Sequence, residues 1–337
     1  MFRKHKKHER RHSNLAFVIF RSLLSLIIFA VLLAGIYSAF KQFSGFDIVK
    51  VNVLQRDILG LIASFIPSNI TLPPQLEKLK EVAPIIDTKE GDAEGLTTKN
   101  NTSLSFKFML VADSHNDNEN LKKALAENKV EFVIGLGDYT DIGSIDELKA
   151  AKKTFDNAGL RYFITSGDHD QWESRNEEKD PTTNFSQVFG RPYQSFSYKN
   201  ARFLLIDNSD NYLGLGENQL NWLRDEIKRI NTEGPGVVLA FAHEPLYHPS
   251  STRMMGKVTY RLMDEAKEIT KMLNDAGVQE VFAGDIHYFT EYNEPETGMS
   301  MTTVGALTAE RNAQTPRYVV VSVFEDGSIE VEDVEVR

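Results

Sequence analysis

The sequence predicts an α/β domain with a mixed β-sheet, preceded by one transmembrane helix. Short apolar runs alternate with segments of helical periodicity from residue 104 to residue 283, a pattern typical of α/β folds. Residues 299–336 instead contain a run of strand-like segments, so the sheet is expected to be mixed rather than purely parallel. Near the N-terminus, residues 22–40 form an apolar stretch of 19 residues without a charge.

A membrane anchor is expected over residues 15–40. As a helix, residues 22–40 would be about 28 Å long, close to the hydrocarbon thickness of a bilayer. Six Lys and Arg residues lie within 1–14, which predicts a cytoplasmic tail and places everything after residue 40 on the other side of the cell membrane. A cleaved signal peptide and a buried core helix are the alternatives. Because Tyr37-Ser38-Ala39 matches a small-x-small cleavage site poorly, we favour a retained signal anchor.

Residues 41–103 are predicted to be a juxtamembrane segment and a linker, since Asp87–Ser103 is rich in Thr, Gly, Asp, Glu and Asn and has no hydrophobic period. The chain has no cysteine, which excludes disulfides and thiolate metal sites. Its net charge is −10 despite the basic tail. The remaining body is therefore acidic, which argues against general nucleic-acid binding.

The folded body of the chain is expected to cover residues 104–337. Short apolar runs predict strands, and helical periods predict the helices between them. The predicted strands are 106–112, 131–136, 161–165, 195–198, 202–207, 236–242, 278–283, 299–304, 317–324 and 328–336. The predicted helices are 118–128, 144–157, 217–231 and 258–274. The segment that follows Gly167 is expected to be a long loop.

Five of these strands end in polar clusters rich in Asp and His. The clusters are Asp113-Ser114-His115, Gly137-Asp138-Tyr139-Thr140-Asp141, Gly167-Asp168-His169-Asp170, His243-Glu244-Pro245 and Gly284-Asp285-Ile286-His287. In open α/β sheets, ligands bind in the crevice at the carboxyl ends of the strands. Carboxylate oxygens and imidazole nitrogens suit hard to borderline divalent cations. Of the eight histidines, three lie in the basic tail and four lie at these strand ends, so a metal site is expected there.

These clusters resemble, in order and spacing, the calcineurin-like metallophosphoesterase superfamily, whose pattern is D-x-H, G-D-x-x-D, G-N-H-D/E, a later H, and G-H-x-H. The resemblance covers about residues 104–337 and includes Gln219-Leu-Asn-Trp-Leu223, which is similar to a helix of its phosphatase-like branches. It implies a four-layer αββα sandwich of two mixed sheets flanked by helices. Purple acid phosphatases lack the first histidine of the pattern, whereas His115 is present here.

The resemblance also implies roles for individual residues. Asp113, His115 and His287 would hold one metal ion. Asp168, His243 and Asp285 would hold a second, with Asp138 bridging the two. His169 would protonate the leaving group, and Asp170 would orient His169.

Two positions depart from the family pattern, because Asp168 replaces the usual Asn and Asp285 replaces the usual His. The site then carries four carboxylates in place of two. We expect this to favour Mn, Mg, Fe or Ca over Zn.

The sequence therefore predicts a hydrolase of phosphate esters with two divalent metal ions and a metal-activated water. The alternatives are a catalytically silent metal-binding ectodomain and a nuclease of the same fold. His248 and Arg253 are candidates for contact with the phosphorylated substrate, and Asn208 is expected to be a turn residue. The substrate itself, whether monoester, diester, nucleotide, lipid or protein, is left open.

Overall fold

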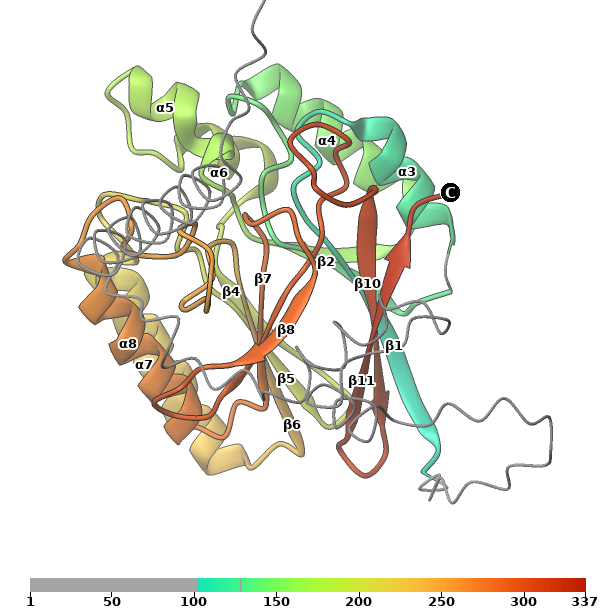
Figure 1. The fold of residues 1–337 in the computed structure, drawn as a ribbon, viewed down its shortest axis with the longest axis vertical. Coiled ribbons are helices and arrows are strands. Elements are labelled where there is room, and N and C mark those ends of the chain that lie inside the picture. Colours follow the sequence, from blue (N-terminus) through green and yellow to red (C-terminus); the bar gives the residue numbers. More distant parts are fainter. Residues whose placement is uncertain (1–101, 128) are drawn as a thin grey trace, which may run out of the picture. The chain divides into compact units, whose positions relative to one another are not determined.

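The computed structural model describes residues 102–127 and 129–337, which form two β-sheets flanked by helices (Figure 1). The predicted basic tail, the predicted membrane span and nearly all of the predicted linker lie outside the described residues. Within the described part of the chain, no helix is long and apolar enough to cross a membrane. The transmembrane helix expected over residues 15–40 therefore rests on the sequence alone.

The first sheet has the strand order β11-β10-β1-β2-β3. Its strands are β1 (Leu104–Val111), β2 (Phe132–Gly135), β3 (Arg161–Ile164), β10 (Arg317–Phe324) and β11 (Ile329–Glu335). Strand β1 is the centre of this sheet, because it pairs in parallel with β2 and antiparallel with β10. Two C-terminal strands are thus added to a parallel β1-β2-β3 unit, which makes the sheet mixed, as the sequence predicted.

The second sheet has the order β4-β5-β6-β7-β9-β8. Its strands are β4 (Gln194–Tyr198), β5 (Ala201–Leu205), β6 (Val237–Ala242), β7 (Glu280–Ala283), β8 (Thr290–Asn293) and β9 (Ser300–Thr303). The four inner strands are parallel, and β4 and β8 pair antiparallel at the two edges. All six residues of β6 are buried, as expected for a parallel strand covered on both faces.

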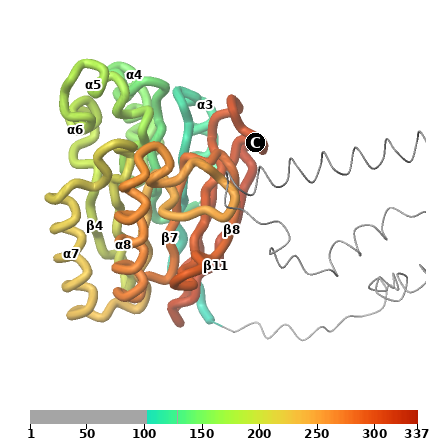
Figure 2. The backbone as a smooth tube through the Cα atoms, turned by 60° about the vertical axis from the view of Figure 1, so that its left-hand side comes forward, coloured from blue at the N-terminus to red at the C-terminus, as the bar shows by residue number. Residues whose placement is uncertain are grey.

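Helices cover the outer face of each sheet. Leu121, Leu148 and Phe185 of α3 (Asn118–Glu127), α4 (Ile145–Ala158) and α6 (Thr183–Phe189) pack on the first sheet. Residues of α7 (Gly216–Glu233) and α8 (Leu262–Asp275) pack on the second sheet in the same way. Figures 1 and 2 show these two helix layers on opposite sides of the paired sheets. The predicted α/β fold, with two mixed sheets and flanking helices, is confirmed.

A phenylalanine-rich core lies between the two sheets. Strand β1 alternates between this core, to which Phe106, Phe108 and Leu110 belong, and the helix-covered outer face. The Phe108 ring stacks on Phe132 of the same sheet and meets Phe203 of the other sheet edge-on, each with 5.4 Å between centroids. Such contacts fix the distance between the sheets and therefore the distance between the loops that follow their strands.

Local signals fix the ends of the most regular helix. Ser144 caps α4 in a reciprocal capping box with Glu147, and Gly159 ends the helix in the left-handed conformation. These residues set the length of the segment between β2 and β3, and both of those strands carry site residues at their carboxyl ends.

Three elements differ from the sequence-based expectations. The long loop after Gly167 contains the 3-10 helix η3 (His169–Gln171), the short helix α5 (Trp172–Asn176) and α6. These helices are too short to show a period, and α6 is held by Asn184, which donates hydrogen bonds to Gly143 and Glu173. Strand β8 was not predicted. Helix α8 begins four residues later than expected, because Gly256 has a φ of +90° and the chain forms turns before Leu262.

Candidate metal centre

The polar clusters follow the carboxyl ends of five strands, and the structure brings them together. Strands β1, β2 and β3 belong to the first sheet, and β6 and β7 to the second. The turns touch directly, since the amide of His115 donates to the Asp138 carbonyl at 3.0 Å and the Asp285 amide donates to the Asp113 carboxylate at 3.1 Å. One site is therefore built from both sheets.

The backbone is strained at the residues expected to bind metal. Nine residues other than glycine have a positive φ in the described chain, and five of them are predicted ligands. These five are Asp113, His115, Asp138, Asp285 and His287. A left-handed conformation costs a non-glycine residue on the order of 1–3 kcal/mol and persists only where other contacts impose it. The left-handed conformation turns the chain away from the strand direction at each of these residues, so that the side chains face the common site.

Two glycines allow the turns after β2 and β3 to touch. A Cβ atom at Gly167 would lie 2.1 Å from Asp138 Oδ1. A Cβ atom at Gly137, where φ is +99°, would lie 2.5 Å from the Gly167 amide nitrogen. Glycine therefore precedes the aspartate in both clusters because no side chain fits between the two turns.

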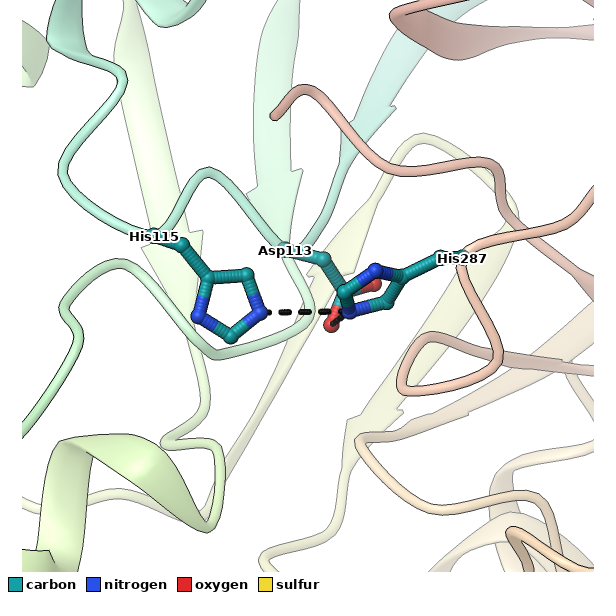
Figure 3. A group of neighbouring side chains, drawn as sticks. All are labelled: Asp113, His115 and His287. Atoms are coloured by element: carbon teal, nitrogen blue, oxygen red, sulfur yellow. Dashed lines mark hydrogen bonds and ion pairs between the residues drawn. The ribbon is translucent and has the colours of Figure 1, made fainter. Parts of the chain in front are cut away.

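The first predicted ligand set is present (Figure 3). Asp113, His115 and His287 offer ligand atoms that all lie within 4.8 Å of one another. His115 Nε2 lies 3.2 Å from His287 Nε2, and His287 Nε2 lies 3.7 Å from Asp113 Oδ1. His115 Nε2 also lies 3.5 Å from Asp138 Oδ2. Burial lowers the pKa of His115 to about 3 and that of His287 to about 4. Both rings are thus neutral at pH 7, the form in which imidazole binds a metal.

The second predicted ligand set lies beside the first. Asp168, His243 and Asp285 also have ligand atoms within 4.8 Å of one another. His243 Nε2 lies 3.5 Å from Asp138 Oδ1 and 3.6 Å from Asp168 Oδ1. Asp138 thus faces His115 with one carboxylate oxygen and His243 with the other, which is the position required of a bridging ligand.

An unsatisfied nitrogen indicates that this arrangement suits a cation. His243 is completely buried, and its Nδ1 lies 2.8 Å from the Leu136 carbonyl, to which it donates. Its Nε2 has no hydrogen-bond partner in the described structure and points between two carboxylates. Buried polar atoms without partners are rare in folded proteins. Two carboxylates and one orphaned imidazole nitrogen, with the other ring nitrogen held by a carbonyl, fit a divalent metal ion.

Without a metal ion, a proton on His243 balances the nearby acids. Burial acts to lower the pKa of His243, but the charges of Asp138 and Asp168 outweigh it and raise that pKa well above its ordinary value. Burial acts to raise the pKa of Asp168, but the hydrogen bond and the charge of His243 have the larger opposite effect and lower that pKa to about 2. Burial raises the pKa of Asp113 to about 7. A metal ion would take over the positive charge that His243 carries.

The proposed proton donor, His169, lies at the edge of the two ligand sets. Its ring stacks on Trp172, with 3.8 Å between centroids, and its Nδ1 lies 2.7 Å from the carbonyl of Asp141. Nδ1 therefore donates to this carbonyl. The backbone amide of His169 donates to Asp138 Oδ1 at 2.9 Å. The imidazole is thus held by the Trp172 ring on one face and by the Asp141 carbonyl at Nδ1. Nε2 is then the nitrogen that can exchange a proton with a substrate.

The expected role of Asp170 is corrected by its contacts. Asp170 is buried, and its carboxylate accepts hydrogen bonds from the Thr140 amide and hydroxyl and from the Gly167 amide. The His169 ring is oriented by the carbonyl of Asp141, because the Asp170 carboxylate is turned toward the β2 loop. Asp170 ties the loops after β2 and β3 together.

Two asparagines outside the predicted ligand sets also support the site. Asn208 is fully buried, and its Oδ1 accepts hydrogen bonds from the amides of His243 and Glu244, each at 3.0 Å. Its Nδ2 donates to the Glu244 carbonyl at 2.7 Å. Asn208 was expected to be only a turn residue, but its side chain also holds the backbone of the predicted ligand His243 in place. Asn211 donates to Asp168 Oδ2 at 3.3 Å.

A cavity of about 220 Å³ opens above the two ligand sets. Besides predicted ligands and His169, its lining includes Asn211, Glu244, Arg253, Lys257 and Arg311. Arg253 Nη1 donates to the Asp285 carbonyl at 2.9 Å. Burial, together with the nearby Asp285 charge, raises the pKa of Glu244 to about 8.

The two candidates for substrate contact are separated by the structure. Arg253 lies in this cavity, as expected. His248 lines a different cavity, beside α8. Its Nδ1 accepts hydrogen bonds from the amides of Ser250 and Ser251, so its ring shapes the loop that follows β6.

Comparison with known proteins agrees with the fold and identifies a family. A family model described as calcineurin-like phosphoesterase matches residues 106–289, more than half of the chain. The solved structure of PhoD has a TM-score of 0.50 at 11% identity, covering 70% of this chain and 72% of that chain. The yellow lupin purple acid phosphatase PPD1 has a TM-score of 0.49 at 12% identity, covering 70% of this chain and about half (52%) of that chain. The chain belongs to the calcineurin-like phosphoesterase family.

Proposed function

We propose that this protein hydrolyses phosphate esters at a centre of two divalent metal ions. The observation that carries the proposal is the arrangement of two ligand sets around one carboxylate. Asp113, His115 and His287 form one set, Asp168, His243 and Asp285 form the other, and Asp138 faces both. Bound divalent ions would polarise the phosphoryl oxygens and lower the pKa of a water that attacks phosphorus.

The protein supplies the proton for the leaving group. His169 is held at Nδ1 by the Asp141 carbonyl and is kept in place by its stacking on Trp172. It lies next to the cavity, with its ring centroid 4.6 Å from that of His115. A positioned general acid of this kind contributes about 10²- to 10⁴-fold to the rate. Arg253 donates to the Asp285 carbonyl at the cavity wall, where it can bind a phosphate oxygen.

The ligand chemistry favours hard cations. Four carboxylates, Asp113, Asp138, Asp168 and Asp285, belong to the ligand sets. Mn, Fe and Mg, and also Ca, bind such oxygen-rich sites more readily than Zn does in competition. This preference is the reason to supply several metals in the test.

The test uses the full-length chain in detergent, stripped of metal and resupplied with Mn, Mg, Fe, Ca or Zn. Turnover of p-nitrophenyl phosphate and bis-p-nitrophenyl phosphate would be measured for the parent, Asp138→Asn and His169→Gln. We expect the first variant to lose metal and activity together. The second should keep its metal and lose about 10²- to 10⁴-fold in kcat. Asp156→Asn, a carboxylate change on the exposed side of α4, is the matched control and should retain activity.

The same experiment separates the alternatives. Tight metal binding without turnover of either ester, at any metal, would identify a silent metal-binding ectodomain. Cleavage of DNA with a steep dependence on salt concentration would indicate a nuclease. Activity that is unchanged in His169→Gln would contradict the role of that histidine as the acid.

We also propose that residues 15–40 anchor the chain in the cell membrane, with residues 1–14 in the cytoplasm and the catalytic domain outside it. The support is the apolar stretch without charge at 22–40, preceded by basic residues. Extraction of membranes at alkaline pH and protease treatment of intact cells test both points. Release of the protein by alkaline extraction, or protection of the catalytic domain from protease, would contradict this placement.

A further inference from the structure

Within residues 102–127 and 129–337, the exposed large apolar side chains are not scattered over the surface. Eight such side chains are exposed within the described residues. Seven of them, all except Leu104, lie in the segments that follow the carboxyl ends of parallel strands. The seven, here called the apolar rim, are Ile142, Trp172, Tyr212, Leu213, Val258, Tyr260 and Tyr288. Apolar groups gathered on one part of a surface mark a place of interaction.

Four residues of the apolar rim lie in the catalytic cavity or next to residues of the site. Val258 lines that cavity, and Trp172 stacks on the proposed acid His169. Tyr212 directly follows the cavity residue Asn211, and Tyr288 directly follows the predicted ligand His287. The rim therefore comes from loops after β2, β3, β5, β6 and β7, each of which also carries a residue of the site or its support.

Three cations line the catalytic cavity together with Val258 of the apolar rim. Arg253, Lys257 and Arg311 line the catalytic cavity and are exposed. None of the three has an acidic partner within ion-pair distance among the described residues, although the body is acidic overall. Their charges are thus available to an anion that enters the cavity. A ligand that suits this surface has an anionic group, which the cations would bind, and an apolar part beside it, which the apolar rim would contact.

We propose that the substrate is a lipid phosphate in a membrane, and that the apolar rim docks on the bilayer surface to admit its headgroup. This proposal rests on the proposed phosphoesterase function. Tyr and Trp side chains are favoured at bilayer interfaces because they are apolar with one polar end. Cations near an anionic lipid surface add to the attraction. A bilayer contacts the tips of several separate loops at once, which suits seven side chains from five loops better than a single extended peptide does.

The reaction at this surface is a hydrolysis that needs only water. The water oxygen forms a bond to phosphorus, and the bond between phosphorus and the lipid oxygen breaks. The lipid oxygen takes up one proton, for which His169 is placed, and leaves as an alcohol. The other product is inorganic phosphate, which carries the oxygen of the attacking water. The alcohol stays in the bilayer while the phosphate is released to solvent.

The test compares substrates and rim variants of the full-length chain in detergent, with Mn supplied. The substrates are dioleoyl phosphatidate in mixed micelles, p-nitrophenyl phosphate and a phosphoserine peptide. The rim variant is Leu213→Ser combined with Tyr260→Ser, since these two side chains are the most exposed of the rim, at 61% and 76%, and do not line the catalytic cavity. Leu104→Ser, at a site 48% exposed away from the rim, is the matched control.

We expect the rim variant to lose about tenfold in kcat/KM on micellar phosphatidate, mainly through KM, because about 1.4 kcal/mol of surface contact is removed. Its turnover of p-nitrophenyl phosphate should stay within about twofold of the parent, and Leu104→Ser should match the parent on every substrate. Turnover of p-nitrophenyl phosphate without turnover of phosphatidate would overturn this proposal and leave the phosphoesterase function standing. Absence of turnover on all substrates would overturn the proposed function and this proposal with it. A loss in the rim variant on the phosphopeptide alone would show that the rim binds a protein.

Discussion

Replacement of Asn208 tests how the second ligand set is held in place. The side chain is fully buried and makes hydrogen bonds to the amides of His243 and Glu244 and to the Glu244 carbonyl. Asn208→Ala removes these three bonds, each worth about 1 kcal/mol net, and leaves two buried N–H groups without an acceptor. We expect the free energy of unfolding to fall by about 3–5 kcal/mol. Most domains have a free energy of unfolding of roughly 5–15 kcal/mol, so the variant is expected to remain folded.

The second effect of this substitution is on metal binding. The amide that Asn208 holds belongs to His243, whose Nε2 faces Asp138 and Asp168. Loss of a residue that orients a metal ligand typically weakens metal binding by about 10- to 100-fold. Titration calorimetry with Mn measures this affinity, and thermal unfolding without metal measures stability. A loss of about 4 kcal/mol should lower Tm by roughly 10 °C in a domain of this size.

A matched variant separates positioning from general loosening. Asn184 is also buried and donates hydrogen bonds to the Gly143 carbonyl and to Glu173, neither of which is a predicted ligand. Asn184→Ala should lower stability by about 2 kcal/mol and leave the affinity for Mn within about twofold. Equal weakening of Mn binding in both variants, or unchanged binding in Asn208→Ala, would refute the reasoning.

Three further predictions concern the charge and the geometry of the site. Because the pKa of His243 is raised well above its ordinary value in the metal-free protein, its proton must leave when a metal binds. Affinity for Mn should therefore rise by at least about tenfold per pH unit near neutrality, since Asp113, whose pKa burial raises to about 7, also gives up a proton there. Calorimetry in buffers of different ionisation enthalpy measures the proton release. Asp285→His combined with Asp168→Asn should shift the metal preference toward Zn, measured by competition between Mn and Zn. Gly167→Ala should lower stability by more than about 3 kcal/mol because its Cβ would lie 2.1 Å from Asp138 Oδ1, whereas Gly159→Ala, with no atom within 4 Å, should cost about 1 kcal/mol in thermal unfolding.

The predicted ligands could be found from the sequence because each one lies within four residues of the end of an apolar run. An apolar strand fixes where its own carboxyl end lies, and parallel strands bring those ends to one edge. Asp113 and His115 after β1, and Asp285 and His287 after β7, are of this kind. The two-sheet architecture was reached through the family resemblance, since alternation alone did not show that the strands divide between two sheets.

Other parts of the site could not be predicted, for reasons that differ among them. The partner of His169 is the backbone carbonyl of Asp141, which leaves no mark on the sequence because every residue has a carbonyl. Asn208 lies in a loop after β5 and acts on a turn after β6. Helices α5 and α6 are too short to show a period and depend on tertiary hydrogen bonds. In each case the deciding contact joins residues far apart in the chain.

The charge of the site connects the unusual ligands to the cavity around them. Two divalent ions would carry four positive charges, which the carboxylates of Asp113, Asp138 and the two departures from the family pattern would balance. A phosphate ester would then meet a metal centre with no surplus charge to attract it. Under the proposed function, Arg253, Lys257 and Arg311 would supply that attraction, since they line the cavity and form no ion pair with an acidic side chain among the described residues. Because these cations line the cavity and are not among the predicted ligands, they would contribute to binding of the substrate more than to the chemical step. Replacement of Lys257 should accordingly raise KM far more than it lowers kcat.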